Sequence, residues 1–409
     1  MVVDYLNKEI AERIELIKQG RVPEGYKKYR REIISQDWGK HTVKEAMSIK
    51  NNLRIPISEQ ERKKIQGTYP YYGPTRIQDY INRYNIEGEH VLIGEDGDHF
   101  LKYKDKEMTL LVDGKFNVNN HAHILKGTEV CKTKWFYYFF QHRNIMESIT
   151  RQGVGRYKLT KEALQDIEMY LPVHKEQEKI IQILQIWDRA ITLKEQLIRE
   201  KESQKKALKS KLLIDTSTSE WRQLRLGDIL EEKKEITVRN NQYPVLTSSR
   251  TGLFLQSEYF SKQIASNDNI GYKVVRKGDF TYRAMSDDGK FTFNQLEEYD
   301  IGIVSPAYAV FGVRLDYNDV FIKEILNSSI FTKYIAKKIQ GGTRLSLKYS
   351  SLASIQIKTP DLAKQIEIAR KIELASKEIA LLKQEVEALK KQKRGLMQLL
   401  LTGIVRVNE

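Results

Sequence analysis

The side chains best placed to do chemistry in this sequence are two arginines in matched glycine loops. Arg156 follows Gly153-Val154-Gly155, and Arg344 follows Gly341-Gly342-Thr343. Glycine permits another backbone to approach closely, and arginine can clamp a phosphate or read a base edge. The pair therefore predicts contacts to nucleic acid at two places in the protein.

Other candidate loops in the same two parts of the chain combine basic with aromatic or amide groups. Lysine and arginine pair with phosphates, while a few side chains at base edges choose the sequence. The candidates are Tyr71, Tyr72, Arg76, Lys102, Lys104 and Lys158 in the first half, and Arg250, Lys273, Arg276, Arg283, Lys290 and Lys348 in the second. A solvated surface charge explains any single member equally well, so the prediction depends on the pattern.

The charge balance of the whole chain favours a polyanionic partner. Lys and Arg number 69 against 54 Asp and Glu, a formal net charge of +15, and the pI is about 9.4. Such a surplus is typical of nucleic-acid binding, with a solvated basic surface as the alternative. Affinity would then weaken as the salt concentration rises.

Catalytic motifs are either missing or better explained as turns. A DNA methyltransferase needs a glycine-rich cofactor turn and a Pro-Pro or Pro-Cys motif, but none of the eight prolines neighbours another and none precedes Cys131. Asp113-Gly114-Lys115 and Asp288-Gly289-Lys290 resemble the acid-x-Lys ending of many nucleases, yet Asp-Gly is a turn signal. The sequence therefore predicts no catalytic residues and, without a Walker-type loop, no bound nucleotide.

The histidine and cysteine residues predict structure rather than metal binding. His121 and His123 would share one face of a strand and could form a metal pair. The single cysteine, Cys131, precedes an aromatic run and is expected to be buried, so we expect a structural histidine pair and no metal site. One cysteine also excludes an internal disulfide, which fits a reducing cytosol.

The chain shows no feature of a membrane or secreted protein. The N-terminus does not resemble a signal peptide, and no stretch approaches the roughly 18 apolar residues that a membrane span needs. We therefore expect a soluble protein of the cytoplasm.

An internal repeat must position the candidate residues. Adding 188 to each number aligns two segments without a gap. Gly153, Arg156, Pro172, Gln177, Lys205 and Leu213 meet the same residue types at Gly341, Arg344, Pro360, Gln365, Lys393 and Leu401. Helical periodicity alone cannot place glycine, arginine and proline in register, so the sequence indicates a duplicated unit.

Each copy contains a long helix that follows Pro172 or Pro360, since proline favours a fresh start. The second helix has a heptad seam at Ile368, Ile372, Ala375, Ile379, Leu382, Val386, Leu389, Lys393, Leu396 and Leu400. The first has the same seam from Ile180 to Leu212, where lysine stems can cover apolar surface. Because each helix has one apolar stripe, we expect them to pair antiparallel; pairing with other chains is the alternative.

Short β-like runs broken by glycine and aspartate precede each long helix. The predicted fold is α+β, with two globular α/β domains separated by two long antiparallel coiled-coil helices in a pseudo-twofold repeat. The start of the chain resembles the end of one more repeat, which would close a cycle. The expected segments are an N-terminal helical segment (1–36), the first domain (37–173), the central long helix (174–215), the second domain (216–361), the C-terminal long helix (362–403) and a tail (404–409).

Several runs also carry a likeness to a known family. They are Val91-Leu92-Ile93-Gly94-Glu95-Asp96-Gly97, Asn119-Asn120-His121-Ala122-His123, Leu171-Pro172 with Glu176-Gln177-Glu178-Lys179-Ile180, and Ser305-Pro306-Ala307-Tyr308-Ala309-Val310-Phe311. Together with the repeat, they resemble the specificity subunit of type I restriction-modification enzymes. Ile366 departs from the pattern because the first copy has an acidic residue there, so the two partner contacts need not be equivalent.

The resemblance implies a DNA-binding subunit with two target-recognition domains, each of which reads one half of a bipartite, asymmetric site. It also implies that two methyltransferase (modification) subunits dock on the long helices and that two restriction subunits can join them. S-adenosylmethionine, ATP and magnesium would be bound by those partners, with no cofactor in this chain.

Two dissimilar domains at a fixed separation would read unlike half-sites across an unspecified spacer. The sequence therefore predicts a non-catalytic DNA-recognition scaffold. Two alternatives stay open, a self-sufficient nuclease or methyltransferase with embedded recognition domains, and a structural coiled-coil adaptor that does not select a DNA sequence.

Overall fold

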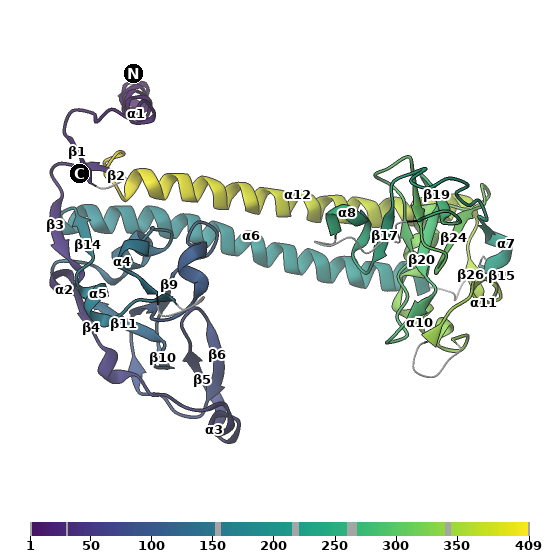
Figure 1. Ribbon diagram of the computed structural model, residues 1–409, viewed down its shortest axis with the longest axis horizontal. Helices are drawn as coiled ribbons and strands as arrows, with labels where there is room; N and C mark the ends of the chain where they lie inside the picture. The colour runs from purple at the N-terminus through teal and green to yellow at the C-terminus, as the bar shows by residue number, and fades with distance from the viewer. Residues whose placement is uncertain are drawn as a thin grey trace. The chain divides into compact units, whose positions relative to one another are not determined.

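The computed structural model describes residues 2–29, 32–151, 157–214, 221–259, 268–339 and 345–407. The chain divides into two compact units (Figure 1). Unit 1 comprises Met1–Lys194 and Glu385–Glu409, and unit 2 comprises Glu195–Gln384. Each unit therefore contains one β-rich domain and one segment of each long helix.

The two long helices are α6 (His174–Ile214) and α12 (Leu362–Leu400). In unit 1, Lys194 of α6 pairs with Glu385 at 2.7 Å, and Asp188 pairs with Lys393. In unit 2, Glu202 of α6 pairs with Lys383 at 2.7 Å, and Leu213 shares a core cluster with Ile368 and Ile372. Residue numbers rise along one helix as they fall along the other, so the segments run antiparallel within each unit, as predicted.

The predicted heptad seam faces inward in both units. Ile180 and Leu184 are fully buried in unit 1, and Ile368 and Ile372 are buried in unit 2. Within the described ranges, no helix combines the length and apolar character that crossing a membrane requires.

Among its described residues, the domain of unit 1 has two four-stranded sheets, with strand orders β6-β5-β10-β7 and β4-β11-β8-β9. The strands are β3 (Gly39–Thr42), β4 (Met47–Ile49), β5 (Gln66–Tyr72), β6 (Ile77–Ile81), β7 (Ile86–Glu87), β8 (His90–Gly94), β9 (Thr109–Val112), β10 (Lys115–Val118), β11 (Ala122–Gly127), β12 (Thr150–Arg151), β13 (Tyr157–Lys158) and β14 (Glu168–Leu171). The helices are α2 (Val43–Ala46), η1 (Asn51–Leu53), α3 (Glu59–Lys64), η2 (Asp98–Lys102), α4 (Thr133–Phe140), η3 (Met146–Ser148) and α5 (Lys161–Gln165).

The aromatic run that the sequence places after Cys131 forms α4 and supplies five buried side chains to the largest core cluster of unit 1. Trp135 packs edge-to-face on Trp38, with ring centroids 5.5 Å apart. The same cluster includes Leu184 of α6 and Met397 of α12, so the domain and both helices share one core. Cys131 is buried, and burial raises the pKa of its thiol, as expected for a structural cysteine.

The chain ends of unit 1 meet. Helix α1 (Val2–Lys18) is followed by β1 (Tyr26–Tyr29) and β2 (Glu32–Ser35), which pair antiparallel. The Tyr26 hydroxyl donates to the Gly403 carbonyl at 2.9 Å, and the Ser35 amide donates to the Thr402 carbonyl at 2.9 Å. The segment predicted as helical thus also contains a strand pair, and this pair contacts the residues that follow α12.

The described residues of unit 2 form one four-stranded sheet, in the order β16-β24-β20-β22, and four two-stranded sheets. The strands are β15 (Arg222–Arg225), β16 (Leu230–Glu232), β17 (Leu246–Ser249), β18 (Gly252–Leu255), β19 (Lys273–Arg276), β20 (Phe280–Arg283), β21 (Met285–Ser286), β22 (Asn294–Gln295), β23 (Ile301–Val304), β24 (Tyr308–Val313), β25 (Leu345–Ser346) and β26 (Gln356–Thr359). The helices are α7 (Leu226–Ile229), α8 (Gln256–Tyr259), α9 (Asp319–Leu326), α10 (Ser329–Ala336) and α11 (Tyr349–Ala353).

Two buried glutamines show the internal repeat in three dimensions. Gln177 donates to the Pro172 carbonyl at 3.0 Å, and its side-chain oxygen accepts from the Lys132 amide at 3.0 Å. Gln365 donates to the Pro360 carbonyl at 2.9 Å and accepts from the Asn318 amide at 2.9 Å. Each glutamine thus ties the start of a long helix to its own domain. The predicted α+β fold with a duplicated unit is confirmed.

Candidate nucleic-acid interface

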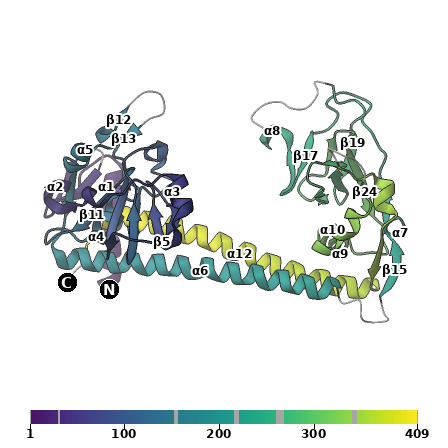
Figure 2. The same ribbon diagram turned by 90° about the horizontal axis from the view of Figure 1, so that it is seen from below.

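A concave surface in unit 2, the unit 2 concavity, collects three of the predicted cations. Arg283 ends β20, Arg250 lies between β17 and β18, and Lys290 follows β21; all three are exposed. They surround a cavity of about 490 Å³ that is also lined by Ser248, Ser249, Tyr259, Asp288, Phe291 and Tyr308. Figure 2 shows β17 and α8 of this unit on the side away from α6.

Asp288 holds one side of the unit 2 concavity. Its carboxylate accepts hydrogen bonds from the Lys290 amide at 3.2 Å, the Ser286 hydroxyl at 3.0 Å and Arg250 at 2.7 Å. These donors, the Lys290 amide first, lower the pKa of Asp288. Gly289 has φ +73°, which glycine adopts without strain. Asp288-Gly289-Lys290 is therefore a turn, and so is Asp113-Gly114-Lys115 between β9 and β10.

Arg344 and its repeat partner Arg156 lie outside the described residues. The described residues that flank the Arg344 loop nevertheless reach the concavity. Strand β25 pairs with β21, with Leu345 opposite Ser286. A Cβ on Gly289 would lie 3.0 Å from Leu345 Cδ1 and 3.7 Å from Ile339 Cδ1. Ile339 and Leu345, the described residues on either side of that loop, thus lie close to the turn that carries Lys290.

Three predicted cations of unit 2 do not line the concavity. Lys273 donates to the Tyr308 carbonyl at 2.6 Å, so its ammonium group is used within the domain. The Arg276 guanidinium forms a bidentate ion pair with the Glu235 carboxylate, in which Nε and Nη2 donate at 3.1 and 2.9 Å. Lys348 is exposed and immediately precedes α11 in the chain.

Unit 1 brings three predicted cations to one end of β8, which we call the unit 1 edge. Gly94 ends β8, and a Cβ there would lie 2.6 Å from the His99 ring and 3.2 Å from the Pro74 carbonyl oxygen. Glycine is therefore needed for the close approach of two segments, the 73–76 turn that carries Arg76 and the η2 helix that carries Lys102.

Strand β13 joins the same edge. The Gly97 amide donates to the Tyr157 carbonyl at 3.1 Å, and the Leu159 amide donates to the Glu95 carbonyl at 2.8 Å. Between them, Lys158 pairs with the Glu95 carboxylate at 3.3 Å. Arg54, which the sequence analysis missed, also pairs with Glu95 and donates to the Asn120 carbonyl at 3.2 Å. No local pattern marks Arg54, because its partners lie far along the chain.

The histidine pair has structural contacts. His123 Nε2 lies 2.7 Å from the Leu159 carbonyl, and Nδ1 lies 2.8 Å from the Asn51 amide nitrogen. His121 Nδ1 lies 2.8 Å from the Asp96 carboxylate. Both nitrogens of His123 are thus used by protein groups, and the described residues contain no group of three or more metal-ligating side chains.

The expected role of Tyr71 is wrong. Tyr71 is only 1% exposed, and its hydroxyl accepts from the Ile57 amide at 3.0 Å and donates to the Ile55 carbonyl at 2.8 Å. It is a core residue because β5 lies between β6 and β10. Tyr72 is half-buried and packs edge-to-face on Phe116. Lys104 is exposed, and its carbonyl accepts from Arg394 of α12 at 2.8 Å.

Protonation of His99 is expected to destabilise the unit 1 edge. Burial lowers the pKa of His99 from 6.5 to about 4. Between these values the unfolded chain binds more protons than the folded one, so stability is present above pH 6.5 and is lost as the pH falls toward 4. The loss between pH 7 and pH 5 should be about 2 kcal/mol. Urea unfolding at both pH values should show a smaller loss for His99→Gln than for wild type; equal losses would contradict this role.

Comparisons with known proteins agree with this architecture. Residues 35–202 match the family model of the type I restriction modification DNA specificity domain. A putative type I restriction enzyme specificity subunit of Haemophilus influenzae is 37% identical over 140 residues, 34% of this chain and 34% of that protein. The MjaVIII type I restriction enzyme specificity subunit of Methanocaldococcus jannaschii is 22% identical over 379 residues, 84% of this chain and 88% of that protein.

The fold also has a counterpart among solved structures. A type I restriction-modification system S subunit from M. genitalium superposes with a TM-score of 0.53 at 14% identity, over 89% of this chain and 96% of that one. Residues 35–202 are thus similar to the type I restriction modification DNA specificity domain, and the chain as a whole is similar to the specificity subunits of type I restriction enzymes.

Proposed function

We propose that this chain is the non-catalytic, sequence-specific DNA-binding subunit of a type I restriction-modification enzyme. Each domain reads one half of a bipartite, asymmetric site, and the long helices dock two methyltransferase subunits. Those partners, with restriction subunits where present, bind S-adenosylmethionine, ATP and magnesium. The domain boundaries proposed from the sequence, 37–173 and 216–361 around the helices 174–215 and 362–403, are the working division for domain exchange.

The observation that carries this proposal is a duplicated frame with dissimilar basic surfaces. The Gln177 and Gln365 contacts repeat between the units. The unit 2 concavity, however, has exposed arginines and hydroxyl groups, whereas the cations of the unit 1 edge surround the buried end of β8. One scaffold with two different surfaces suits a protein that binds two different base sequences.

The long helices support docking of two equal partners. Ile186 and Leu193 of α6 are 68% and 54% exposed, and Leu374 and Leu381 of α12 are 58% and 56% exposed. These residues are repeat equivalents, and each pair is one heptad apart. Exposed apolar side chains at heptad spacing are typical of a helix face that binds another helix. Two equivalent faces therefore suit two copies of one subunit.

The proposal predicts a new DNA methylation pattern. Cells that express this chain with its methyltransferase subunit should modify a split motif, two short specified blocks around an unspecified gap, which the subunit alone does not modify. Genome-wide detection of modified bases measures both half-sites at once. Exchange of residues 216–361 for the corresponding domain of a relative should change only one block.

Two results would contradict the proposal. Methylation by this purified chain alone would indicate a self-sufficient enzyme. If an active, assembled complex produced no new motif, the chain would instead be a structural adaptor.

A further inference from the structure

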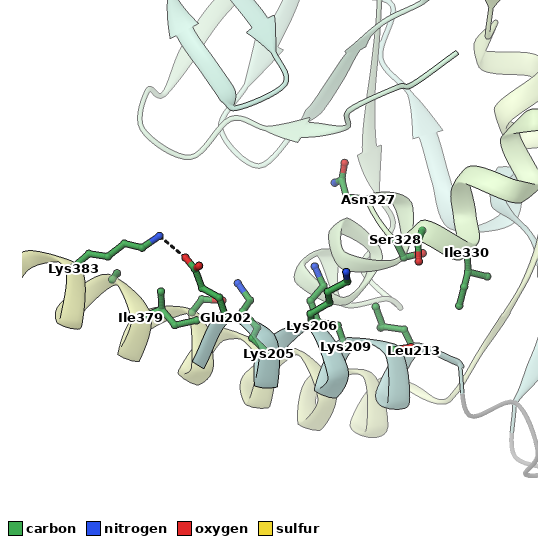
Figure 3. Close-up of a pocket in the computed structure, with 14 residues that line it drawn as sticks. Glu202, Lys205, Lys206, Lys209, Leu213, Asn327, Ser328, Ile330, Ile379 and Lys383 are labelled. Atoms are coloured by element: carbon green, nitrogen blue, oxygen red, sulfur yellow. Dashed lines mark ion pairs between the residues drawn. The ribbon is translucent and has the colours of Figure 1, made fainter. Parts of the chain in front are cut away.

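A second basic cavity lies in unit 2, between the long helices and the loop that joins α9 to α10. Its volume is about 570 Å³ (Figure 3). Lys205, Lys206 and Lys209 of α6 and Lys383 of α12 line it, with a single carboxylate from Glu202. Figure 3 shows the three lysine side chains of α6 extending to the side where the loop carries Asn327 and Ser328. We call this cavity the lysine pocket.

Within the described ranges, two of these lysines form no ion pair of their own, because Glu324 and Glu202, the carboxylates that act on Lys205, are paired with other lysines. Lys383 pairs with Glu202 at 2.7 Å, and Lys209 pairs with Glu324. Lys205 and Lys206 form no ion pair or hydrogen bond with any other residue that the structure describes. Lys205 is half-buried, and this burial lowers the pKa of its ammonium group. An anion in the pocket would offset the cost of burying that charge.

The internal repeat shows that this missing counter-ion is specific to unit 2. The counterpart of Lys205 is Lys393, which pairs with Asp188 in unit 1 and lies 5.4 Å from the centre of the Tyr138 ring. Tyr138 also donates to Asp188 at 2.6 Å. The counterpart of Asp188 is Ser376, whose hydroxyl donates to a backbone carbonyl of its own helix. Unit 1 therefore neutralises its lysine internally, while unit 2 presents the equivalent charge to a cavity.

Lys206, the residue after Lys205, also differs from its repeat counterpart in having no partner group that the structure describes. Arg394 is the repeat counterpart of Lys206, and its guanidinium donates to the Lys104 carbonyl at 2.8 Å. Lys206 has no such acceptor among the described residues and is exposed in the pocket. Two adjacent cations that are satisfied by protein groups in one unit are thus both available in the other.

The remaining lining combines the serine hydroxyl groups of Ser210, Ser328 and Ser329 with apolar side chains. Ser328 caps α10, with its hydroxyl accepting from the Phe331 amide at 3.1 Å, so the positive end of that helix faces the pocket. Leu213 and Ile379 are only 9% and 7% exposed, whereas Ile330 is half-buried and Ala380 is exposed, so apolar groups also line the pocket. A lysine ammonium group is a compact charge and lacks the planar, bidentate donors with which arginine reads a base edge. These lysines therefore fit a phosphate group better than a base edge.

We propose that the lysine pocket binds the sugar-phosphate backbone of DNA and thereby fixes unit 2 on the duplex without reading its sequence. This inference rests on the proposed function, because it assumes that the chain binds DNA. An acidic segment of a partner protein is the competing occupant.

The proposal predicts a loss of affinity that does not depend on sequence. The full complex that contains the Lys205→Gln/Lys206→Gln variant should bind DNA about 10-fold more weakly than the wild-type complex does. The factor should be the same for a duplex with the motif and a duplex without it. The slope of log K against log salt should fall by about 0.9 for each phosphate that the variant no longer neutralises. Fluorescence anisotropy over a salt series measures both quantities. Lys211→Gln/Lys8→Gln, which removes two exposed lysines outside the pocket, is the matched control and should change both quantities much less.

Neutral phosphates provide an independent test. Duplexes in which single phosphates are replaced by methylphosphonate should reveal one or two positions that weaken wild type but not Lys205→Gln/Lys206→Gln. If the folded variant had unaltered DNA affinity and salt slope, the inference about the lysine pocket would be overturned. The proposed function would still stand if cells with the wild-type complex methylated the motif. Weaker assembly with the methyltransferase subunit, with DNA binding unchanged, would assign the pocket to an acidic protein segment. If the wild-type complex did not select the motif, the proposed function itself would be refuted.

Discussion

Replacing Arg250, Arg283 and Lys290 together by alanine should abolish selection of one half-site. The three side chains surround the unit 2 concavity, and Arg250 already has its guanidinium oriented by Asp288 at 2.7 Å. A good contact to a base edge is worth about 1–3 kcal/mol, so the triple variant should bind the motif at least about 100-fold more weakly. Competition binding with duplexes altered in either half-site measures this effect.

A matched variant separates specificity from total charge. Arg276→Ala/Lys277→Ala/Lys348→Ala removes the same charge from exposed positions of unit 2 that do not line the concavity. It should weaken motif and non-motif duplexes alike, because only general attraction to phosphates is removed. If both triple variants reduced the preference for the motif equally, the unit 2 concavity would not be the reading surface.

Charge on the outer face of one long helix should remove one methyltransferase subunit from the complex. Ile186 and Leu193 are largely exposed on α6, and each would bury an apolar side chain on docking. Burial of a side chain of this size contributes about 2 kcal/mol, so Ile186→Glu/Leu193→Glu should weaken docking by about 4 kcal/mol, roughly 1000-fold. Native mass spectrometry should then show one methyltransferase subunit instead of two.

The repeat supplies the second half of this test. Leu374→Glu/Leu381→Glu changes the equivalent residues of α12 and should remove the other subunit, and the fourfold variant should remove both. Gln185→Glu/Thr192→Glu adds the same charge one residue earlier at two exposed positions of α6 and should leave two subunits bound. Retention of both subunits by the fourfold variant would exclude these faces as the docking surfaces.

Local periodicity was enough to predict the frame of this protein. The heptad seam, the prolines before each long helix and the offset of 188 residues are properties of neighbouring positions and covalent spacing. Ile180 and Ile368 of the seam are buried, as the pattern predicts, and the matched Gln177 and Gln365 occupy equivalent positions in the two units. A helix stripe must be covered wherever the chain folds, so its pattern determines the helix and its buried face.

Convergence of the candidate side chains could not be predicted in this way. Arg250, Arg283 and Lys290 come from separate strand connections and meet only because β17, β20 and β21 lie near one another. Tyr71 has the residue type of a binding aromatic, but its position in a central strand buries it. Strand order depends on pairings between distant segments, which no local pattern in a single sequence records.

By itself, therefore, the sequence determined the repeat, the two long helices, their buried faces and the family resemblance. Only the tertiary structure decided which cations share a surface and which are neutralised. Lys205 and Lys393 are identical residues at equivalent positions, yet only Lys393 has an aspartate beside it, on the opposite helix. The physical reason is that a charge acquires its partner through space, whereas periodicity describes only neighbours along the chain.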